Sequence, residues 1–327
     1  MMPMRRRLAI ALGAALAALG ALATPAIAFP ERALTLVVPF AAGGPTDKLA
    51  RELAASFGRA IGGSVVVENV GGAGGTLGVA RVARARPDGH TLLLYHIGMA
   101  TSPSLYPKLP YDTLADFAYL GMVNEVPMVL VGRRTLPATD FAALARWLRD
   151  RKRRAVLADA GPGAASQLCG LLLQQSLGVT LTTVSYKGTA PAMADLLAGH
   201  VDILCDQTTN TAEPIAAGTV RAFGVTTPQP LSAPVLAGLP TLHEQGLTGF
   251  EVSIWHGLYA PQGAPPEIAR ALNAALRSAL RDPAFVDRMQ ALGAVVVDDD
   301  RLSPEGHRRF VAAEIERWGR ALRAAAR

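Results

Sequence analysis

Residues that would signal redox or metal chemistry are scarce in this chain. Only 2 cysteines and 6 histidines occur among 327 residues, with no Cys-x-x-Cys pair and no two histidines at the helical spacing of metal ligands. Ser166 lacks the Gly-x-Ser-x-Gly surroundings of a nucleophile elbow. We therefore expect no metal, no cofactor and no catalytic centre.

Neither sign of charge dominates the sequence. The formal net charge is +6, and it falls to +3 without the three arginines at positions 5–7. A surplus this small argues against a nucleic-acid partner. One basic cluster, residues 149–154, follows a helix expected to begin near Asp140, where cations complement the helix dipole. It is interpreted as a solvated helix end rather than a site for a polyanion.

Long apolar runs are missing except near the N-terminus. Residues 8–22 are apolar, follow the three arginines, and lead to an Ala-Ile-Ala sequence that ends at Ala28. This pattern predicts a signal peptide over residues 1–28, cleaved after Ala28, and a periplasmic protein. A membrane anchor is the alternative, but the run is rich in alanine and interrupted by glycine.

The remaining chain, residues 29–327, is long enough for two domains. Apolar runs of strand type alternate in it with helical patterns, which indicates an α/β fold with mostly parallel sheets. Strands are expected over residues 34–40, from Val65 onward, and over residues 91–95, 155–158, 181–185 and 201–204.

Two glycine turns, residues 41–44 and 71–75, follow the first two strands, and each leads into a helix. In an open parallel sheet both turns lie at the same edge, where their bare N–H groups suit an anion. The second turn partly imitates a dinucleotide fingerprint, but Leu77 stands in its sixth position and no P-loop lysine follows. The alternative is a turn that merely lets a helix pack close to a strand.

Polar turns also end the three strands expected after residue 155, at residues 159–163, 186–189 and 205–206. Two groups of strands, each with such turns at one edge, predict two lobes with a cleft between them.

Four stretches together resemble the Bug-type extracytoplasmic solute receptors of tripartite tricarboxylate transporters. They read VVPFAAGGPTD, VVVENVGGAGGTLGVARVARARPDGHTLL, VSYKGTAPAMADLLAGHVDILCD and WHGLYAPQGAPPEIARALNAAL. The resemblance implies a type II periplasmic-binding-protein clamshell, an α/β fold whose two lobes are joined by two crossing segments. Residues 29–126 plus 226–327 would form lobe 1, and residues 127–225 would form lobe 2.

The resemblance also implies a non-enzymatic, monomeric receptor for a small organic anion, such as a di- or tricarboxylate, an amino acid or an aromatic acid. Its partners would be the membrane permease subunits of the transporter. An exported clamshell sensor or enzyme that acts on a small carboxylate is the alternative.

The ligand contacts that the resemblance implies lie on both lobes. In lobe 1 they are Phe40, Ala42, Gly43, Gly44, Asp47, Gly72, Ala73, Gly74, Gly75 and Thr76. In lobe 2 they are Gly161, Gly163, Ala164, Ala165, Ser166, Tyr186, Gly188, Thr189 and Asp206. Backbone amides are expected to hold a carboxylate, with Lys187 less important than the amides beside it. A bulky side chain at Gly74 is expected to abolish binding by obstructing those amides.

Three polar residues have open interpretations. His96 is either a ligand contact or a core histidine. Asp47 either faces the ligand or serves as a helix cap, since a carboxylate would repel an anion. Asp206 is either a cap or a buried acid, and a buried acid needs a ligand amine, a ligand hydroxyl or a water as donor.

The final helix is expected to begin at Ser303 and Pro304 and to return to lobe 1. Its apolar stripe, Val311, Ile315, Trp318 and Leu322, needs a core to cover it.

Cys169 and Cys205, in a chain bound for an oxidising compartment, either form a disulfide or remain two buried thiols. The strand that ends at Cys205 can lie beside the first strand of lobe 2, close to the helix that carries Cys169.

Overall fold

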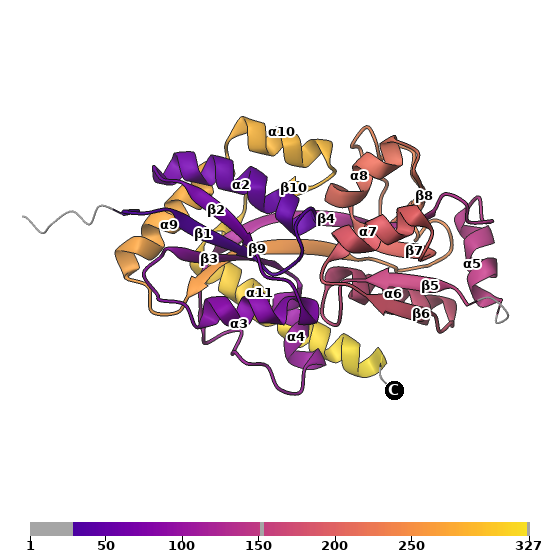
Figure 1. The fold of residues 1–327 in the computed structure, drawn as a ribbon, viewed down its shortest axis with the longest axis horizontal. Helices are drawn as coiled ribbons and strands as arrows, with labels where there is room; N and C mark the ends of the chain where they lie inside the picture. The colour runs from indigo at the N-terminus through magenta and orange to yellow at the C-terminus, as the bar shows by residue number, and fades with distance from the viewer. Residues whose placement is uncertain (1–28, 151–153, 326–327) are drawn as a thin grey trace, which may run out of the picture.

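The computed structural model describes residues 29–150 and 154–325, so the expected signal peptide and most of the basic cluster lie outside the described residues. Figure 1 shows two lobes side by side, with long strands running between them through the centre. One sheet of ten strands has the order β2-β1-β3-β9-β4-β7-β5-β6, and β10 and β8 both pair with β4. The expected two-lobed α/β arrangement is therefore present.

The first lobe contains the outer strands at one end of this order. Its strands are β1 (Leu34–Val38), β2 (Val65–Asn69), β3 (Thr91–His96), β9 (Ser253–Pro261) and β10 (Val295–Val296). Its helices are α2 (Pro45–Ile61), α3 (Thr76–Ala83), α4 (Gly98–Leu105), α9 (Pro266–Ala279), α10 (Pro283–Ala291) and α11 (Pro304–Ala325), with short 3₁₀ turns η1 (Ala73–Gly75) and η2 (Asp300–Leu302).

The second lobe is smaller. Its strands are β5 (Val156–Asp159), β6 (Thr182–Ser185), β7 (Ile203–Gln207) and β8 (Val220–Val225). Its helices are α5 (Phe141–Arg149), α6 (Ala165–Leu177), α7 (Thr189–Ala198) and α8 (Thr208–Ala216). Asp140 caps α5 as a hydrogen-bond acceptor for Ala143 N, in agreement with the helix expected there.

The predicted parallel order is found where the sequence pattern was clearest. Strand β1 runs parallel to β2 and β3, and β5 runs parallel to β6 and β7. The central strands depart from the predicted parallel order. Strand β9 pairs antiparallel with β3 and β4, and β4 pairs antiparallel with β7 and β8. The sheet is therefore mixed, since the chain must cross between lobes and return.

Strand β4 (Phe117–Arg133) is the first crossing segment. It pairs with β9 as far as Pro127 and with β7 and β8 from Met128 onward. Thr226 begins the return path and is fully buried beside it: its N–H donates to Met128 O, and its hydroxyl donates to Val252 O at 2.6 Å. These bonds tie the two crossing segments together where the lobes meet.

Helix α11 packs against α4 and β4, elements of the first lobe. Val311, Trp318 and Leu322 from the expected apolar stripe are buried there. Trp318 Nε1 also donates to the buried Glu314 carboxylate at 3.0 Å. The C-terminal helix thus makes its contacts as predicted, in the lobe where the chain begins (Figure 1). No helix within the described ranges is both long enough and apolar enough to cross a membrane.

Cys169 and Cys205 form a disulfide, with their Cα atoms 6.1 Å apart. Cys169 lies in α6 and Cys205 in β7, which pairs with β5 as the doubly wound order suggested. Both residues are buried inside the second lobe. Of the two interpretations left open by the sequence, the structure selects the bridge.

Removing this disulfide should destabilise the protein. The bridge spans a sequence separation of 36 residues. Closing a loop of that length lowers the entropy of the unfolded chain and so raises the free energy of unfolding by about 3 to 4 kcal/mol. The free energies of unfolding measured in urea for oxidised and for dithiothreitol-reduced protein should differ by up to this amount. A Cys169→Ala/Cys205→Ala variant provides the control, because reductant should not change its unfolding. Two free thiols per chain in denatured, unreduced protein would contradict the bridge.

Candidate functional site

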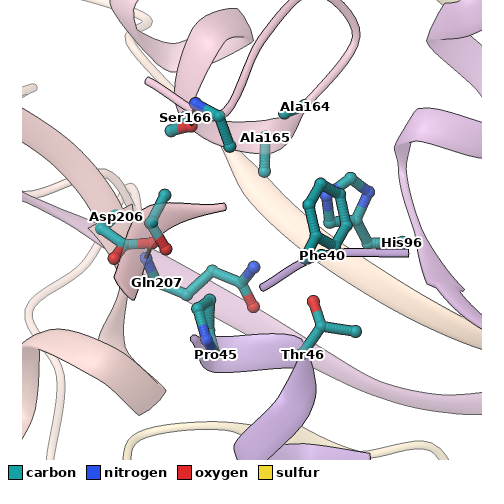
Figure 2. Close-up of a pocket in the computed structure, with 11 residues that line it drawn as sticks. Phe40, Pro45, Thr46, His96, Ala164, Ala165, Ser166, Asp206 and Gln207 are labelled. Atoms are coloured by element: carbon teal, nitrogen blue, oxygen red, sulfur yellow. Dashed lines mark hydrogen bonds between the residues drawn. The ribbon is translucent and has the colours of Figure 1, made fainter. Parts of the chain in front are cut away.

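A pocket lies where the two lobes meet. It is a small pocket, with about 280 Å³ of empty space that includes its opening to solvent. Its lining comes from both lobes (Figure 2): Phe40, Pro45, Thr46 and His96 from the first, and Ala160, Ala164, Ala165, Ser166, Thr189, Asp206 and Gln207 from the second. The pocket therefore suits a small molecule held between the lobes.

Four helices begin at this pocket without a side-chain cap. They are α2, α6, α7 and α8, whose first residues or N-caps contribute to the lining. By contrast, Asp140 and Asp282 cap α5 and α10, which start elsewhere. Uncapped first turns carry N–H groups with no intrahelical partner and the positive end of the helix dipole. Their convergence makes the pocket favourable for an anion.

His96 supplies a neutral donor to the same pocket. Its Nδ1 accepts the Gly98 N–H at 3.0 Å, and its ring stacks on Tyr95 with Phe40 beside it. Burial lowers the pKa of His96 to about 3, so the ring is uncharged at neutral pH. Because Nδ1 is the acceptor, the ring proton is on Nε2. His96 thus combines both interpretations, a buried core residue that also faces the pocket.

Asp206 is a buried acid in the pocket wall. Its carboxylate accepts from Gln207 N at 2.8 Å and from Asn210 Nδ2 at 2.6 Å. Burial is the largest influence and raises the pKa of Asp206 to about 6. The capping interpretation does not hold, because the N-cap of α8 is Gln207. Asp206 is thus a buried acid in the pocket wall whose pKa lies close to neutral pH.

Behind Thr46 lies a polar chain that the sequence did not reveal. Thr46 Oγ1 is 3.3 Å from His256 Nε2, and His256 Nδ1 is 3.0 Å from Asn124 Oδ1. His256 and Asn124 are fully buried. They come from β9 and β4, so only the pairing of the two crossing strands brings them together. No group of three or more metal-ligating side chains was found among the described residues.

The structure brings together part of the predicted ligand-binding set. Lining the pocket are Phe40, His96, Ala164, Ala165, Ser166, Thr189 and Asp206. Outside this lining are Ala42, Gly43, Gly44, Asp47, Gly72, Ala73, Gly74, Gly75, Thr76, Gly161, Gly163, Tyr186 and Gly188. Pro45, Thr46 and Ala160 line the pocket and were missed, whereas Gln207, also in the lining, belongs to the polar run after Asp206 that the sequence offers for reading polar substituents of a ligand. Pro45 and Thr46 begin the helix into which the first glycine turn leads, and a helix start at a cleft is itself a signal for ligand contact.

Asp47 and Tyr186 are engaged within their own lobes. The Asp47 carboxylate accepts from Gly43 N and Arg51 Nε, both at 2.9 Å, and from Asn69 Nδ2. These donors hold the pKa of Asp47 below its usual range despite its burial. Asp47 thus lies in the first turn of α2, where a carboxylate suits the helix dipole, and it binds the Gly43 N–H before the helix instead of capping the first turn. The Tyr186 hydroxyl donates to Asp195 instead of facing the pocket.

The glycine turns of the first lobe contact the backbone of the second lobe. Ala41 N donates to Lys187 O at 2.9 Å, while the Lys187 side chain is exposed. The Tyr106 hydroxyl lies within hydrogen-bond distance of Ala73 O at 2.7 Å and Pro162 O at 2.8 Å. These contacts show that the two turns also form the surface on which the lobes meet.

Gly74 has a different role from the one expected of it. A Cβ atom at Gly74 would lie 1.8 Å from Pro162 O and 2.9 Å from the Tyr106 hydroxyl oxygen. The obstacle is therefore the backbone of the opposite lobe, and Gly74 is outside the pocket lining. A side chain here would keep the lobes apart before it reached a ligand.

Gly74→Ala should weaken binding of the small organic anion expected from the sequence at least about tenfold, because the packed Pro162 carbonyl leaves no room for the added carbon atom. Gly178→Ala is a matched control, since φ is 61° at Gly74 and 64° at Gly178, where a Cβ atom would meet nothing within 4 Å. Both variants carry the same backbone strain of about 1 kcal/mol. Calorimetry should show near-normal affinity for the control only. Equal affinities in the two variants would refute the steric role.

Comparison with known proteins agrees with this geometry. A family model described as "Tripartite tricarboxylate transporter family receptor" matches residues 49–326. The structure of the periplasmic binding protein BugD is similar, with a TM-score of 0.88, 46% identity, and coverage of 91% of this chain and 99% of that one. MatC from Rhodopseudomonas palustris, solved with bound malate, is similar with a TM-score of 0.84 and 39% identity, and the match covers 89% of this chain and 99% of MatC. An R. palustris protein solved with adipate has a TM-score of 0.85 and 34% identity, and the match covers 91% of this chain and 98% of that one.

Because BugD is a periplasmic binding protein of the same fold, the two-lobed binding-protein fold and the Bug-type resemblance predicted from the sequence are both confirmed. The chain belongs to the receptor family of the tripartite tricarboxylate transporters.

Proposed function

We propose that this protein binds a small dicarboxylate between its lobes and delivers it to the membrane permease subunits of a tripartite transporter. The convergence of four uncapped helix N-termini on one pocket carries the proposal. No lysine or arginine lines that pocket, so amide groups and helix dipoles must balance the ligand charge. Such recognition permits ready release, which a transport receptor needs.

The ligand class follows from size and from the relatives. Malate and adipate, the molecules bound in two of the similar structures, are small dicarboxylates. The pocket here is small and has helix N-termini from both lobes, so a molecule with an acidic group at each end could contact both. We propose this class, dicarboxylic amino acids included, ahead of other amino acids, aromatic acids and tricarboxylates.

We further propose that the receptor is not an enzyme and acts as a periplasmic monomer after cleavage at Ala28. The lobe boundaries are proposed at residues 126/127 and 225/226. Just past the first, from Met128 onward, β4 exchanges β9 for the second-lobe strands as its partner. Thr226, the first residue past the second, donates its N–H to Met128 O of lobe 2. Hinge motion at these two crossings would open the pocket.

Binding can be tested directly on protein that has been unfolded, dialysed and refolded. Malate, succinate and adipate should raise the melting temperature, because a ligand at 100 times its Kd stabilises the folded state by about 2.7 kcal/mol. The dimethyl ester of succinate is the matched control, as it keeps the carbon chain but lacks both charges. If no acid in the panel raises the melting temperature more than the ester, the proposal is wrong.

Affinity should fall as pH rises above about 6. A bound anion raises the pKa of Asp206 further above its value of about 6, so the complex takes up a proton. Proton uptake lowers affinity by up to about tenfold per pH unit above that pKa. Burial holds the pKa of His96 and of His256 below the usual range, so neither ring contributes. Calorimetry from about pH 6.5 to 8.5 measures the slope.

Asp206→Asn should remove this pH dependence, because the amide does not titrate. Asp159→Asn is the control: Asp159 is also a buried acid, but it lies outside the pocket lining and accepts from Ser185 Oγ and Gly161 N. Its variant should keep the wild-type slope. Identical slopes in wild type and Asp206→Asn would contradict the role of Asp206.

A further inference from the structure

The hydroxyl of Thr46 occupies a distinctive place in the pocket. Thr46 is the second residue of α2, and its side chain is 2% exposed. Figure 2 shows its oxygen directed toward the space beside Phe40 and His96. On its other side the same oxygen lies 3.3 Å from His256 Nε2. What Thr46 offers a ligand therefore depends on where its single proton goes.

The positions of the protons follow from the partners behind Thr46. Asn124 Nδ2 points at Met289 Sδ, 3.6 Å away, which leaves Asn124 Oδ1 facing His256 Nδ1 at 3.0 Å. An amide oxygen only accepts, so His256 Nδ1 carries the ring proton. Burial lowers the pKa of His256 well below its usual value, so the ring holds no second proton. His256 Nε2 is therefore an acceptor, and Thr46 donates to it.

This arrangement leaves Thr46 Oγ1 with lone pairs for the ligand and no proton. Were Thr46 to turn its proton toward a carboxylate, the buried His256 Nε2 would lose its donor. The Gln207 side chain extends into the pocket toward Thr46 (Figure 2). Gln207 Oε1 is buried and has no hydrogen-bond partner within the described part of the chain. Thr46 Oγ1 is thus an acceptor on one side of a pocket that otherwise favours an anion, and Gln207 Oε1 is a second acceptor without a donor among the described residues, in an amide that also carries the Nε2 donor.

We propose that Thr46, held as an acceptor by His256 and Asn124, is a specificity-determining residue that selects dicarboxylates with a hydrogen-bond donor on the carbon chain. That donor is a hydroxyl or an ammonium group. The inference rests on the proposed function and adds to it a preference within the ligand class. His256 and Asn124 are positioning residues, because they act only through Thr46.

Three four-carbon acids separate these chemistries: malate carries a hydroxyl, aspartate carries an ammonium group, and succinate carries neither. In calorimetry, wild-type protein should bind either aspartate or at least one enantiomer of malate about three- to tenfold more tightly than it binds succinate. A larger gain for aspartate than for malate identifies the ammonium group as the preferred donor, and the reverse order identifies the hydroxyl. Succinate binding as tightly as both would overturn the inference.

Thr46→Val keeps the shape of the side chain and removes the hydroxyl. It should reduce the preference over succinate to about one, with succinate affinity changed less than about threefold, and Thr46→Ser should restore the preference. Equal weakening of all three acids in Thr46→Val would mean a merely structural role and would overturn the inference.

His256→Phe tests the positioning step, because it frees the Thr46 proton to donate to a carboxylate. Succinate should then bind more tightly than to wild type while the preferred acid loses its advantage. An unchanged preference in a folded His256→Phe variant would overturn the role of His256, and the Thr46→Val and Thr46→Ser pair decides the inference if that variant does not fold. Wild-type protein that binds none of the acids would instead overturn the proposed function, and this inference with it.

Discussion

Unsatisfied backbone N–H groups at the seam between the lobes are the constraint on which the rest of the site depends. Helices α2, α6, α7 and α8 all begin there, and none has a side-chain cap. Leaving buried amides without acceptors is costly, so a seam of this kind requires an acceptor of negative charge or water. Neither Lys48 nor Lys187 lines the pocket: Lys48 lies 3.9 Å from Glu213, and Lys187 is exposed.

The same seam explains why backbone, rather than side chains, dominates the contact between the lobes. Ala41 N meets Lys187 O directly, and the Pro162 carbonyl reaches the turn at Gly74. A glycine at such a position is required by the opposite lobe as much as by its own turn. Steric fit between lobes and affinity for the ligand are therefore coupled, because the pocket is complete only when both walls are in place.

Donors and acceptors are separated within the pocket. His96 and the helix N-termini present N–H groups, whereas Thr46 and Asp206 present oxygen. Burial sharpens this division, because it keeps the pKa of His96 low and raises the pKa of Asp206 to about 6. The neutral histidine rings thus act as fixed hydrogen-bond donors or acceptors. Among the residues that line the pocket, Asp206 is the one whose pKa lies near neutral pH.

The sequence by itself determined the alternation of strands and helices, the glycine turns, the final helix and the family, because these depend on local periodicity and short motifs. It also located seven of the eleven residues that line the pocket, including Phe40, Ser166 and Asp206, since strand ends and helix starts can be recognised locally. Only the tertiary structure decided the antiparallel crossing strands, the bridge between Cys169 and Cys205, and the contact of Gly74 with Pro162. The link from Thr46 through His256 to Asn124 also depends on the fold, because it joins residues up to 210 positions apart. Such pairings are fixed by which strands become neighbours and how closely the lobes approach, and no local pattern records either distance.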